Sequence, residues 1–428
     1  MTQVLITGAT GKVGNAVARP LVARGEAVRA LLRDPVAARA SLPGEVELLA
    51  GDVVDREACR RAVAGVEAVF ISHGIYEQWV CNLAIFDAVN AAGAENVAVA
   101  AREAGVARIV HTSTYDVFDA DRNGHLDERQ LATAPKQTPY ERSKQRAEEL
   151  GLAAAGAGTE VVIVNPGMVY GPGPWASAGL DASLLDCLSG RLPGVPRGAG
   201  LAFVDAVAAG HVAALERGVA GERYVLAGPY VALIDFFRRA VELAGRGRVP
   251  MQVPPAVAQA MARASEAVSR ITKRPPLLPD GQLRFLLWGA DPDSRKAELE
   301  LGYNPVPLDD GLSRTVAWLR ASGRLDIGKR SHHLAAESTA QEARSDHKPD
   351  EGWRHGRPQP QPDWGSRVGP AHPRQADGGG ATSPARRDRG DPGGQRLRAR
   401  EAGARAAPRW RIEHRRARLP AARLAARA

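Results

Sequence analysis

The sequence predicts an α/β fold with a doubly wound parallel sheet, followed by a smaller, mostly helical cap domain and a disordered basic tail. Three observations predict it. Short apolar runs alternate with longer Ala-rich helical stretches in the first part of the chain, Gly/Pro-rich turns separate helices after Asn165, and the composition changes again at Asp326.

The expected strands are apolar throughout, which is typical of strands that helices cover on both faces of a parallel sheet. They cover residues 4–7, 27–32, 46–50, 68–71, 108–111 and 161–164, and the longest helical stretches between them cover 14–24, 84–104 and 140–155. Consecutive β-α units of this kind predict a doubly wound sheet.

Two domains are expected before the tail. The first covers 1–165, with late strands from about 201–230, and the second covers 166–325 and is interleaved with it. Helices of the second are expected over 233–244, 255–270 and 311–321, where apolar residues recur at helical spacing.

The tail, 326–428, carries the net charge of the chain. It holds 22 Lys+Arg and 12 Asp+Glu, whereas residues 1–325 hold 35 and 36, so the +9 of the whole chain arises there. With little apolar periodicity the tail cannot bury enough surface to fold. Arg clusters would suit nucleic acid or anionic lipid, but few aromatic residues are interleaved for base stacking, and we favour a non-functional extension.

Cysteine usage and hydropathy indicate a reducing compartment. Cys59, Cys81 and Cys187 are widely spaced and form no metal-ligand or disulfide pattern, so no metal site is expected. No signal-peptide pattern and no apolar run of about 20 residues is present, which predicts a cytoplasmic protein without a membrane partner.

A glycine-rich loop follows the first strand. Gly8, Gly11 and Gly14 have the G-x-x-G-x-x-G spacing, between a strand and a helix. Such glycines allow a tight turn and let a pyrophosphate sit on the helix N-terminus. The loop therefore predicts a Rossmann-type, dinucleotide-binding first domain, and a merely structural turn is the alternative.

The end of the second strand indicates which dinucleotide is bound. Arg33 would suit the 2′-phosphate of NADP(H), whereas Asp34 would suit the ribose hydroxyl of NAD(H). We favour NADP(H), with a solvated surface role for Arg33 as the alternative. Asp52, after the third strand, is placed to bond the adenine or to cap the next helix.

Tyr140 and Lys144 are four residues apart on the helix over 140–155, so their side chains share one face. A fixed ammonium beside a phenol lowers the phenol's pKa from about 10 toward neutrality. The pair predicts a proton donor and acceptor, although this spacing also occurs by chance.

Five motifs in this order together resemble an extended short-chain dehydrogenase/reductase, within the dihydroflavonol-4-reductase-like branch of the NAD-dependent epimerase/dehydratase group. They are Gly8–Gly14, Gly51–Val53, His111–Thr114, Tyr140–Lys144 and Asn165–Pro172. The resemblance covers about 1–325.

The resemblance implies that Thr114, Tyr140 and Lys144 form the catalytic set, with Ser113 as the competitor of Thr114 and a local structural role as its alternative. It also implies a set of residues that contact the cofactor: Gly8, Thr10, Gly11, Lys12, Val13, Arg33, Asp52, Val53, His73, Gly74, Tyr140, Lys144, Pro166 and Met168. His73 departs from the small apolar residue usual at its position, and we expect it to contact the cofactor through its backbone.

The substrate pocket is expected to have aromatic and apolar walls from Tyr76, Gln78, Trp79, Tyr170 and Trp175, which suits a hydrophobic or aromatic carbonyl compound. Each of these residues has ordinary core packing as its alternative. The run 119–130 nearly matches a calcium-binding loop but has Gln130 at the position that requires a bidentate Glu, so we interpret it as a polar loop.

The sequence therefore predicts an NAD(P)-dependent oxidoreductase acting on CH–OH groups, with Tyr140 as proton donor or acceptor. A nucleotide-sugar epimerase or dehydratase with tightly bound NAD, and a non-catalytic NADP-binding regulator, are the alternatives. The expected partner is a small-molecule substrate; nucleic acid is not expected, and a homodimer stays open.

Overall fold

The computed structural model describes residues 3–325 except 77–79, 81, 157, 174–178, 273–282 and 284–285. These described residues all fall within one compact unit, Met1–Ser338. The predicted tail lies outside the described residues, as do Gln78, Trp79 and Trp175. The division into two domains after Asn165 stays a prediction.

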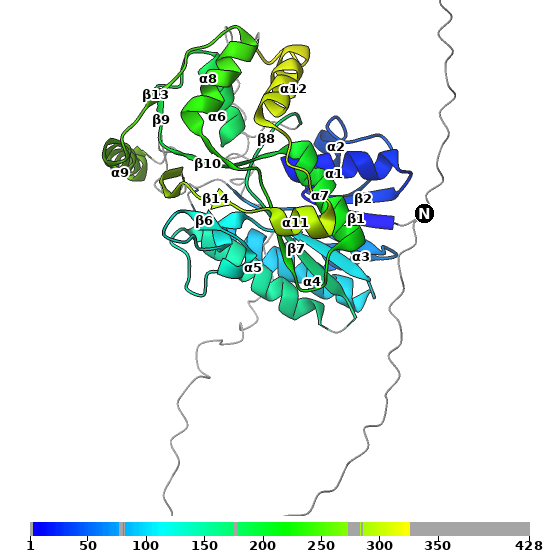
Figure 1. Cartoon of the computed structure of the whole chain (residues 1–428). Helices are drawn as coiled ribbons and strands as arrows, with labels where there is room; N and C mark the ends of the chain where they lie inside the picture. Colours follow the sequence, from blue (N-terminus) through cyan, green and yellow to red (C-terminus); the bar gives the residue numbers. More distant parts are fainter. Residues whose placement is uncertain are drawn as a thin grey trace, which may run out of the picture. The chain divides into compact units, whose positions relative to one another are not determined.

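A seven-stranded parallel sheet forms the centre of this unit (Figure 1). Its spatial order is β3 (Glu47–Ala50), β2 (Ala27–Leu32), β1 (Gln3–Thr7), β4 (Ala68–Ile71), β5 (Arg108–Thr112), β7 (Glu160–Pro166) and β11 (Arg223–Leu226). The order reverses between β1 and β4, which is where doubly wound sheets bind ligands. The predicted fold class is confirmed.

Helices cover both faces of the sheet, because successive residues of each strand point to opposite faces and are apolar on both. On one face α1 (Lys12–Ala23), α7 (Val204–Arg217) and α11 (Arg295–Leu301) pack on Ile6, Val110 and Val164. On the other, α3 (Arg56–Val63), α4 (Gly93–Glu103) and α5 (Pro139–Ala155) pack on Leu5, Val69 and Ile163. The short helix α2 (Pro35–Ala38) joins β2 to β3.

A π-helical segment, η1 (Phe86–Ala92), leads directly into α4. Segments of this kind are rare and occur often at functional sites. It packs beside the start of α5.

The cap has its own apolar core between two small sheets and three helices. Its elements are the strands β8 (Met168–Tyr170), β9 (Gly194–Val195), β10 (Gly198–Phe203), β12 (Tyr230–Ala232) and β13 (Met251–Gln252), with α6 (Leu180–Leu188), α8 (Leu233–Ala244) and α12 (Leu308–Ala321). Of the late strands expected between 201 and 230, only β11 joins the main sheet. The other, β10, pairs with β8 and β12, and Gly198 allows β12 to approach, since a Cβ there would lie 2.2 Å from the Val231 carbonyl oxygen.

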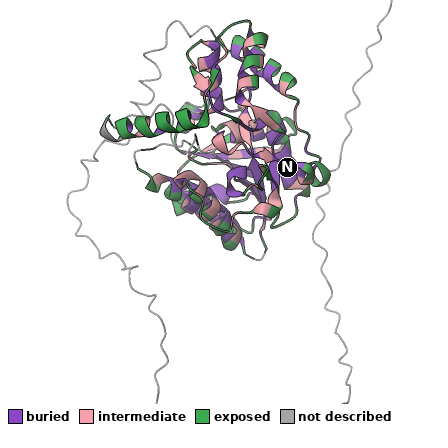
Figure 2. Cartoon of the chain, turned by 60° about the vertical axis from the view of Figure 1, so that its left-hand side comes forward, coloured by how far each residue is buried: buried purple, intermediate pink, exposed green. Residues whose placement is uncertain are grey.

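The remaining elements lie at the border of the two regions. They are η2 (Tyr115–Val117), β6 (His125–Leu126), η3 (Glu128–Gln130) and β14 (Asp291–Pro292), together with α9 (Pro255–Thr272). Most residues of α9 are exposed, and Figure 2 shows this long helix standing away from the packed layers. In the described part of the chain, no helix is long and apolar enough to cross a bilayer.

Candidate active site

The glycine loop forms the tight turn that its sequence predicts. Gly8 has a φ of +71°, and a Cβ there would lie 2.6 Å from the backbone of His73. A Cβ on Gly14 would lie 2.4 Å from the Gly8 carbonyl oxygen, and the Gly11 amide donates to that oxygen at 2.9 Å. Only glycine fits these two positions, and the turn delivers the chain into α1.

The N-terminus of α1 is free to bind an anion. Gly11 caps the helix without a side-chain hydrogen bond, and no acidic residue occupies the first turn. Thr10 and Gly11 are exposed, and Lys12 and Val13 are partly buried. Amide groups at such a terminus, with the positive end of the helix dipole, suit a phosphate. The residues present therefore fit the pyrophosphate of a dinucleotide.

The side chain of Lys12 reaches across to the cap. Its Nζ donates to the carbonyl oxygen of Gly171 at 2.6 Å and lies 2.5 Å from Oδ2 of Asp181 on α6. Both side chains of this ion pair are largely buried. The contact was not predicted, since Lys12 was expected at the cofactor only.

The end of β2 leaves Arg33 exposed, without a hydrogen bond or ion pair to the described part of the chain. The neighbouring Asp34 caps α2, with its Oδ1 accepting from the Ala37 amide at 2.9 Å. Asp52 accepts from the Val54 amide, and Asp55 caps α3. Asp52 is therefore not the helix cap that was its alternative role, and Val53 packs in the core.

The backbone of His73 lies against Gly8 of the glycine loop, and its ring points into the protein, so its expected backbone contact with the cofactor stays a prediction. The ring Nδ1 shares a hydrogen bond with Thr7 Oγ1 at 2.8 Å. Burial, reinforced by the positive charge of Lys144, lowers the pKa of His73 to about 3. The imidazole is therefore neutral at physiological pH and serves as a structural group.

The helix α5 begins just before Tyr140. Thr138 and Glu141 form a capping box: Thr138 Oγ1 accepts from the Glu141 amide at 3.1 Å, and Glu141 Oε2 accepts from the Thr138 amide at 2.8 Å. Pro139 occupies the first turn, where its missing N–H has no cost. The ring of Tyr140 packs edge-on against Phe86 of η1, at 6.4 Å between centroids.

Lys144 is buried beside β5, and its Nζ donates to the Thr112 carbonyl oxygen at 2.8 Å. A Cβ on Gly74 would lie 3.8 Å from the same nitrogen, so the loop after β4 passes over it. Burial lowers the pKa of Lys144 to about 8, and the carboxylate of Glu148 opposes that shift. The ammonium can therefore exchange its proton near neutral pH.

Thr114 follows β5 and is largely buried. Its Oγ1 accepts from the Asp116 amide at 3.3 Å and so caps η2, which is the local role foreseen as its alternative. The hydroxyl of Ser113 is buried without a hydrogen bond to the described residues. Burial, followed by the charge of Glu141, raises the pKa of Asp116 to about 7.

A buried polar cluster supports this end of β5. Asn165 donates through Nδ2 to the Thr114 carbonyl oxygen at 3.0 Å and to Glu148 Oε1 at 2.9 Å. The other oxygen of Glu148 accepts from Arg223 Nε at 2.6 Å. Because Glu148 lies one turn beyond Lys144, the cluster joins the two segments that carry the predicted catalytic residues.

Sequence reasoning missed Asn90, which lies in η1. Its Oδ1 accepts from the Ile75 amide at 2.7 Å, and its Nδ2 donates to Ile75 O at 3.0 Å and to Ser143 Oγ at 2.9 Å. Ser143 in turn donates to the Tyr140 carbonyl oxygen. Asn90 thus ties the loop after β4 to the helix of Tyr140. It reaches both from the π-helical segment η1.

The residues that were expected near the substrate differ in how far they are buried. Tyr76 is 41 % exposed beside the loop after β4, and Met168 is partly buried in β8. Pro166 is buried at the end of β7. Tyr170, by contrast, is 2 % exposed and packs edge-on against Phe203 and Phe236 in the cap core, which argues for its core role and against a place in the pocket wall.

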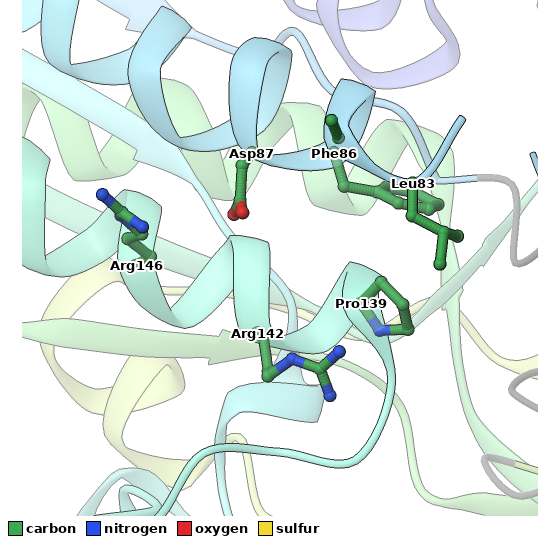
Figure 3. Close-up of a pocket in the computed structure, with 7 residues that line it drawn as sticks. Leu83, Phe86, Asp87, Pro139, Arg142 and Arg146 are labelled. Carbon is green, nitrogen blue, oxygen red and sulfur yellow. The ribbon is translucent and has the colours of Figure 1, made fainter. Parts of the chain in front are cut away.

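A pocket of about 460 Å³ lies on the outer side of Tyr140, between η1 and α5. Its lining residues are Leu83, Ala84, Phe86, Asp87, Pro139, Arg142 and Arg146. Figure 3 shows Asp87 extending from η1 toward α5, the helix that carries Arg142 and Arg146. Tyr140 is not among the lining residues, so the predicted proton donor does not open into this pocket.

Two carboxylates of the polar loop over 119–130 are used locally, whereas Glu128 accepts from the Val225 amide of β11 at 2.8 Å. Asp121 accepts from the amides of Asn123 and His125, and Asp127 caps η3 with Gln130 in a capping box. Within the described ranges, no three His, Cys, Asp or Glu side chains are grouped so that they could hold a metal ion.

The fold and this arrangement define a Rossmann-type protein with a glycine-rich loop after its first strand and a helix that carries Tyr140 and Lys144. The family model of the NAD-dependent epimerase/dehydratase family matches residues 4–227. The chain belongs to this family, and the predicted resemblance to extended short-chain dehydrogenase/reductases is confirmed.

Two relatives and one solved structure are similar to this chain over nearly their whole lengths. Sterol demethylase protein B of Methylococcus capsulatus is 33% identical over 75% of this chain and 99% of its own. The 4-hydroxy-2-methyl-3-oxo-4-farnesyl-3,4-dihydroquinoline-1-oxide ketoreductase of Stigmatella aurantiaca is 31% identical over 77% of this chain and 99% of its own. The crystal structure of gox2253 has 32% identity and a TM-score of 0.64, and covers 76% of this chain and 99% of that one.

The protein is accordingly an enzyme of the extended short-chain dehydrogenase/reductase class, which uses a nicotinamide cofactor and acts on hydroxyl or keto groups. The predicted class of enzyme is confirmed.

Proposed function

We propose that the protein is an NADP(H)-dependent reductase that converts the carbonyl group of a small hydrophobic or aromatic compound to an alcohol. The observation that carries this proposal is the position of Lys144. Its buried ammonium lies one helical turn from Tyr140, against the Thr112 carbonyl oxygen and under the loop of Gly74. A positive charge held there favours the phenolate of Tyr140 and makes it a usable acid and base.

In the proposed reaction Tyr140 donates its proton to the substrate oxygen as that oxygen gains negative charge. Thr114 holds the same oxygen through its hydroxyl, and Lys144 stabilises the phenolate that remains. The bound nicotinamide supplies the hydride to the carbonyl carbon. The capping box of α5 and the bond between Asn165 and the Thr114 carbonyl oxygen keep the two hydroxyl groups in place.

The preference for NADP(H) is supported by the different states of Arg33 and Asp34. Arg33 is exposed and unpaired within the described residues, whereas the Asp34 carboxylate already caps α2. A free guanidinium suits a 2′-phosphate, and a carboxylate engaged elsewhere is a poorer partner for a ribose hydroxyl.

The substrate class is supported by the relatives and by the exposed walls. One relative is named for the reduction of a ketone on a farnesylated quinoline and another for sterol demethylation. Tyr76 offers exposed apolar surface in the loop after β4, and Met168 is partly buried against the cap core. A bulky apolar ketone matches these features better than a nucleotide sugar does.

Substitution of Tyr140 by Phe tests the reaction. We expect Tyr140→Phe to lower NADPH consumption on a panel of apolar ketones by at least about a hundredfold, because general acid catalysis contributes that much. NADPH binding, measured by fluorescence, should stay within twofold of the wild-type value. Full turnover by Tyr140→Phe on a confirmed substrate would exclude the proposed role.

Substitution of Arg33 tests the cofactor. Arg33→Ser should weaken NADPH binding about ten- to a hundredfold and leave NADH binding unchanged, since a charge-assisted contact to one phosphate is lost. Arg61→Ser, at an exposed arginine of α3, is the matched control. Equal losses for both cofactors would contradict the assignment, and NAD that co-purifies tightly would favour the epimerase or dehydratase alternative. Tight NADPH binding without turnover on any carbonyl would favour the regulator.

A further inference from the structure

We propose that Asp181, on helix α6 of the cap, is a positioning residue of the cofactor site that competes with the cofactor phosphates for the ammonium of Lys12. The inference rests on the proposed function, because it takes the Gly8–Gly14 loop as the site of NADP(H). It adds a residue from the cap to a site that the glycine loop alone was expected to form.

Lys12 contributes its backbone to the glycine loop and its side chain to the cap. Lys12 is the first residue of α1, directly after Gly11, and its backbone belongs to the turn that faces a bound phosphate. Its Nζ lies 2.5 Å from Asp181 Oδ2 and donates to Gly171 O at 2.6 Å. An ammonium has three donors, so these two contacts leave one for a further acceptor.

Asp181 is only partly satisfied by this pair. Its side chain is 3% exposed, and Oδ1 is buried without a hydrogen-bond partner among the described residues. Desolvating a carboxylate costs several kcal/mol unless both oxygens are compensated. Burial raises the pKa of Asp181, and the Lys12 charge and the Gly171 backbone oppose that shift without giving Oδ1 a close hydrogen bond among the described residues.

The charges explain how the pair acts on the cofactor. While Lys12 is neutralised by Asp181, it adds little positive potential at the phosphate loop. When phosphates arrive, their negative charge attracts Lys12 and repels the carboxylate, so the link between α1 and α6 is weakened. The pair therefore stabilises the cofactor-free protein and holds its affinity for the cofactor below the affinity that Lys12 would give without Asp181, but above the affinity of a protein that lacks Lys12 as well.

Asp181→Asn separates this competition from a structural role. We expect the cofactor-free variant to unfold at lower temperature than the wild type, and to bind NADPH about three- to tenfold more tightly, because one nearby negative charge is removed. A purely structural pair would lower both stability and affinity. Asp186→Asn, at an exposed carboxylate of the same helix, should change neither quantity.

A second variant covers the case in which Asp181→Asn does not fold. The double variant Lys12→Met/Asp181→Asn removes the pair without leaving a buried charge, which is often nearly neutral for stability. It should bind NADPH more weakly than the wild type. Unchanged NADPH affinity in the double variant, or weaker binding by Asp181→Asn, would overturn the proposal. Failure of the wild type to bind NADPH would instead refute the proposed function.

Discussion

Buried ionisable side chains gather where β5 ends and α5 begins. Lys144 and Asp116 are both largely buried, and burial shifts the pKa of each toward the neutral form. Such groups are costly to hold in a fold, and they concentrate where proton transfer is needed. The arrangement therefore favours acid and base chemistry at this end of the sheet.

Asp116 should make the stability of the protein depend on pH. Its pKa is raised from 3.8 in the unfolded state to about 7 in the folded state, so the folded protein holds a proton that the unfolded chain releases. Stability is then lost as pH rises from about 4 to about 7. Asp116→Asn removes this loss, and should be more stable than the wild type by about 1–3 kcal/mol at pH 8 but not at pH 4.

Urea unfolding at both pH values measures this difference. Asp119→Asn, at an exposed carboxylate paired with Lys136, is the control and should show no such change between the two pH values. A constant difference between Asp116→Asn and the wild type across pH would show that Asp116 ionises normally in the folded protein.

At the scale of elements, α5 carries both Tyr140 and Lys144 and depends on its capping box. Thr138→Ala should cost about 1 kcal/mol of stability and lower kcat several-fold, because the first turn that holds Tyr140 would fray. Asp55→Ala removes the cap of α3 and should cost similar stability while kcat is unchanged. If kcat falls equally in both variants, general destabilisation explains the loss.

The sequence predicts those elements whose signals are local. The strand, glycine turn and helix around Gly8–Gly14 follow from spacing, and so does the shared face of Tyr140 and Lys144. Asn90 could not be predicted, because the π-helical turn that aims it depends on packing against α5. Glu148 and Arg223 form an ion pair although they lie far apart in the sequence, so their contact could not be predicted. Tyr170 is an aromatic residue after β7, and its sequence position does not indicate which face of the cap it packs on. The expectation that it lines the pocket therefore rested on residue type alone.

At the scale of the whole molecule, the cap and the sheet are joined by few polar contacts that reach the predicted site. The pair of Lys12 and Asp181 joins the glycine loop to α6, and Arg314 of α12 pairs with Asp205 of α7. Under the proposed competition, cofactor binding would weaken the link between Lys12 and Asp181. The same fold serves reductases and epimerases, so the site and not the fold decides between them.

The central claim, net hydride transfer from NADPH to a carbonyl carbon, is tested most directly with NADPH that carries deuterium at C4 of the nicotinamide. The best ketone of the carbonyl panel is turned over and the products are analysed by mass spectrometry. We expect one deuterium on the carbinol carbon, from one of the two C4 isotopomers, and one NADP⁺ per alcohol formed. An isomerised product with no net NADP⁺ formation would contradict it.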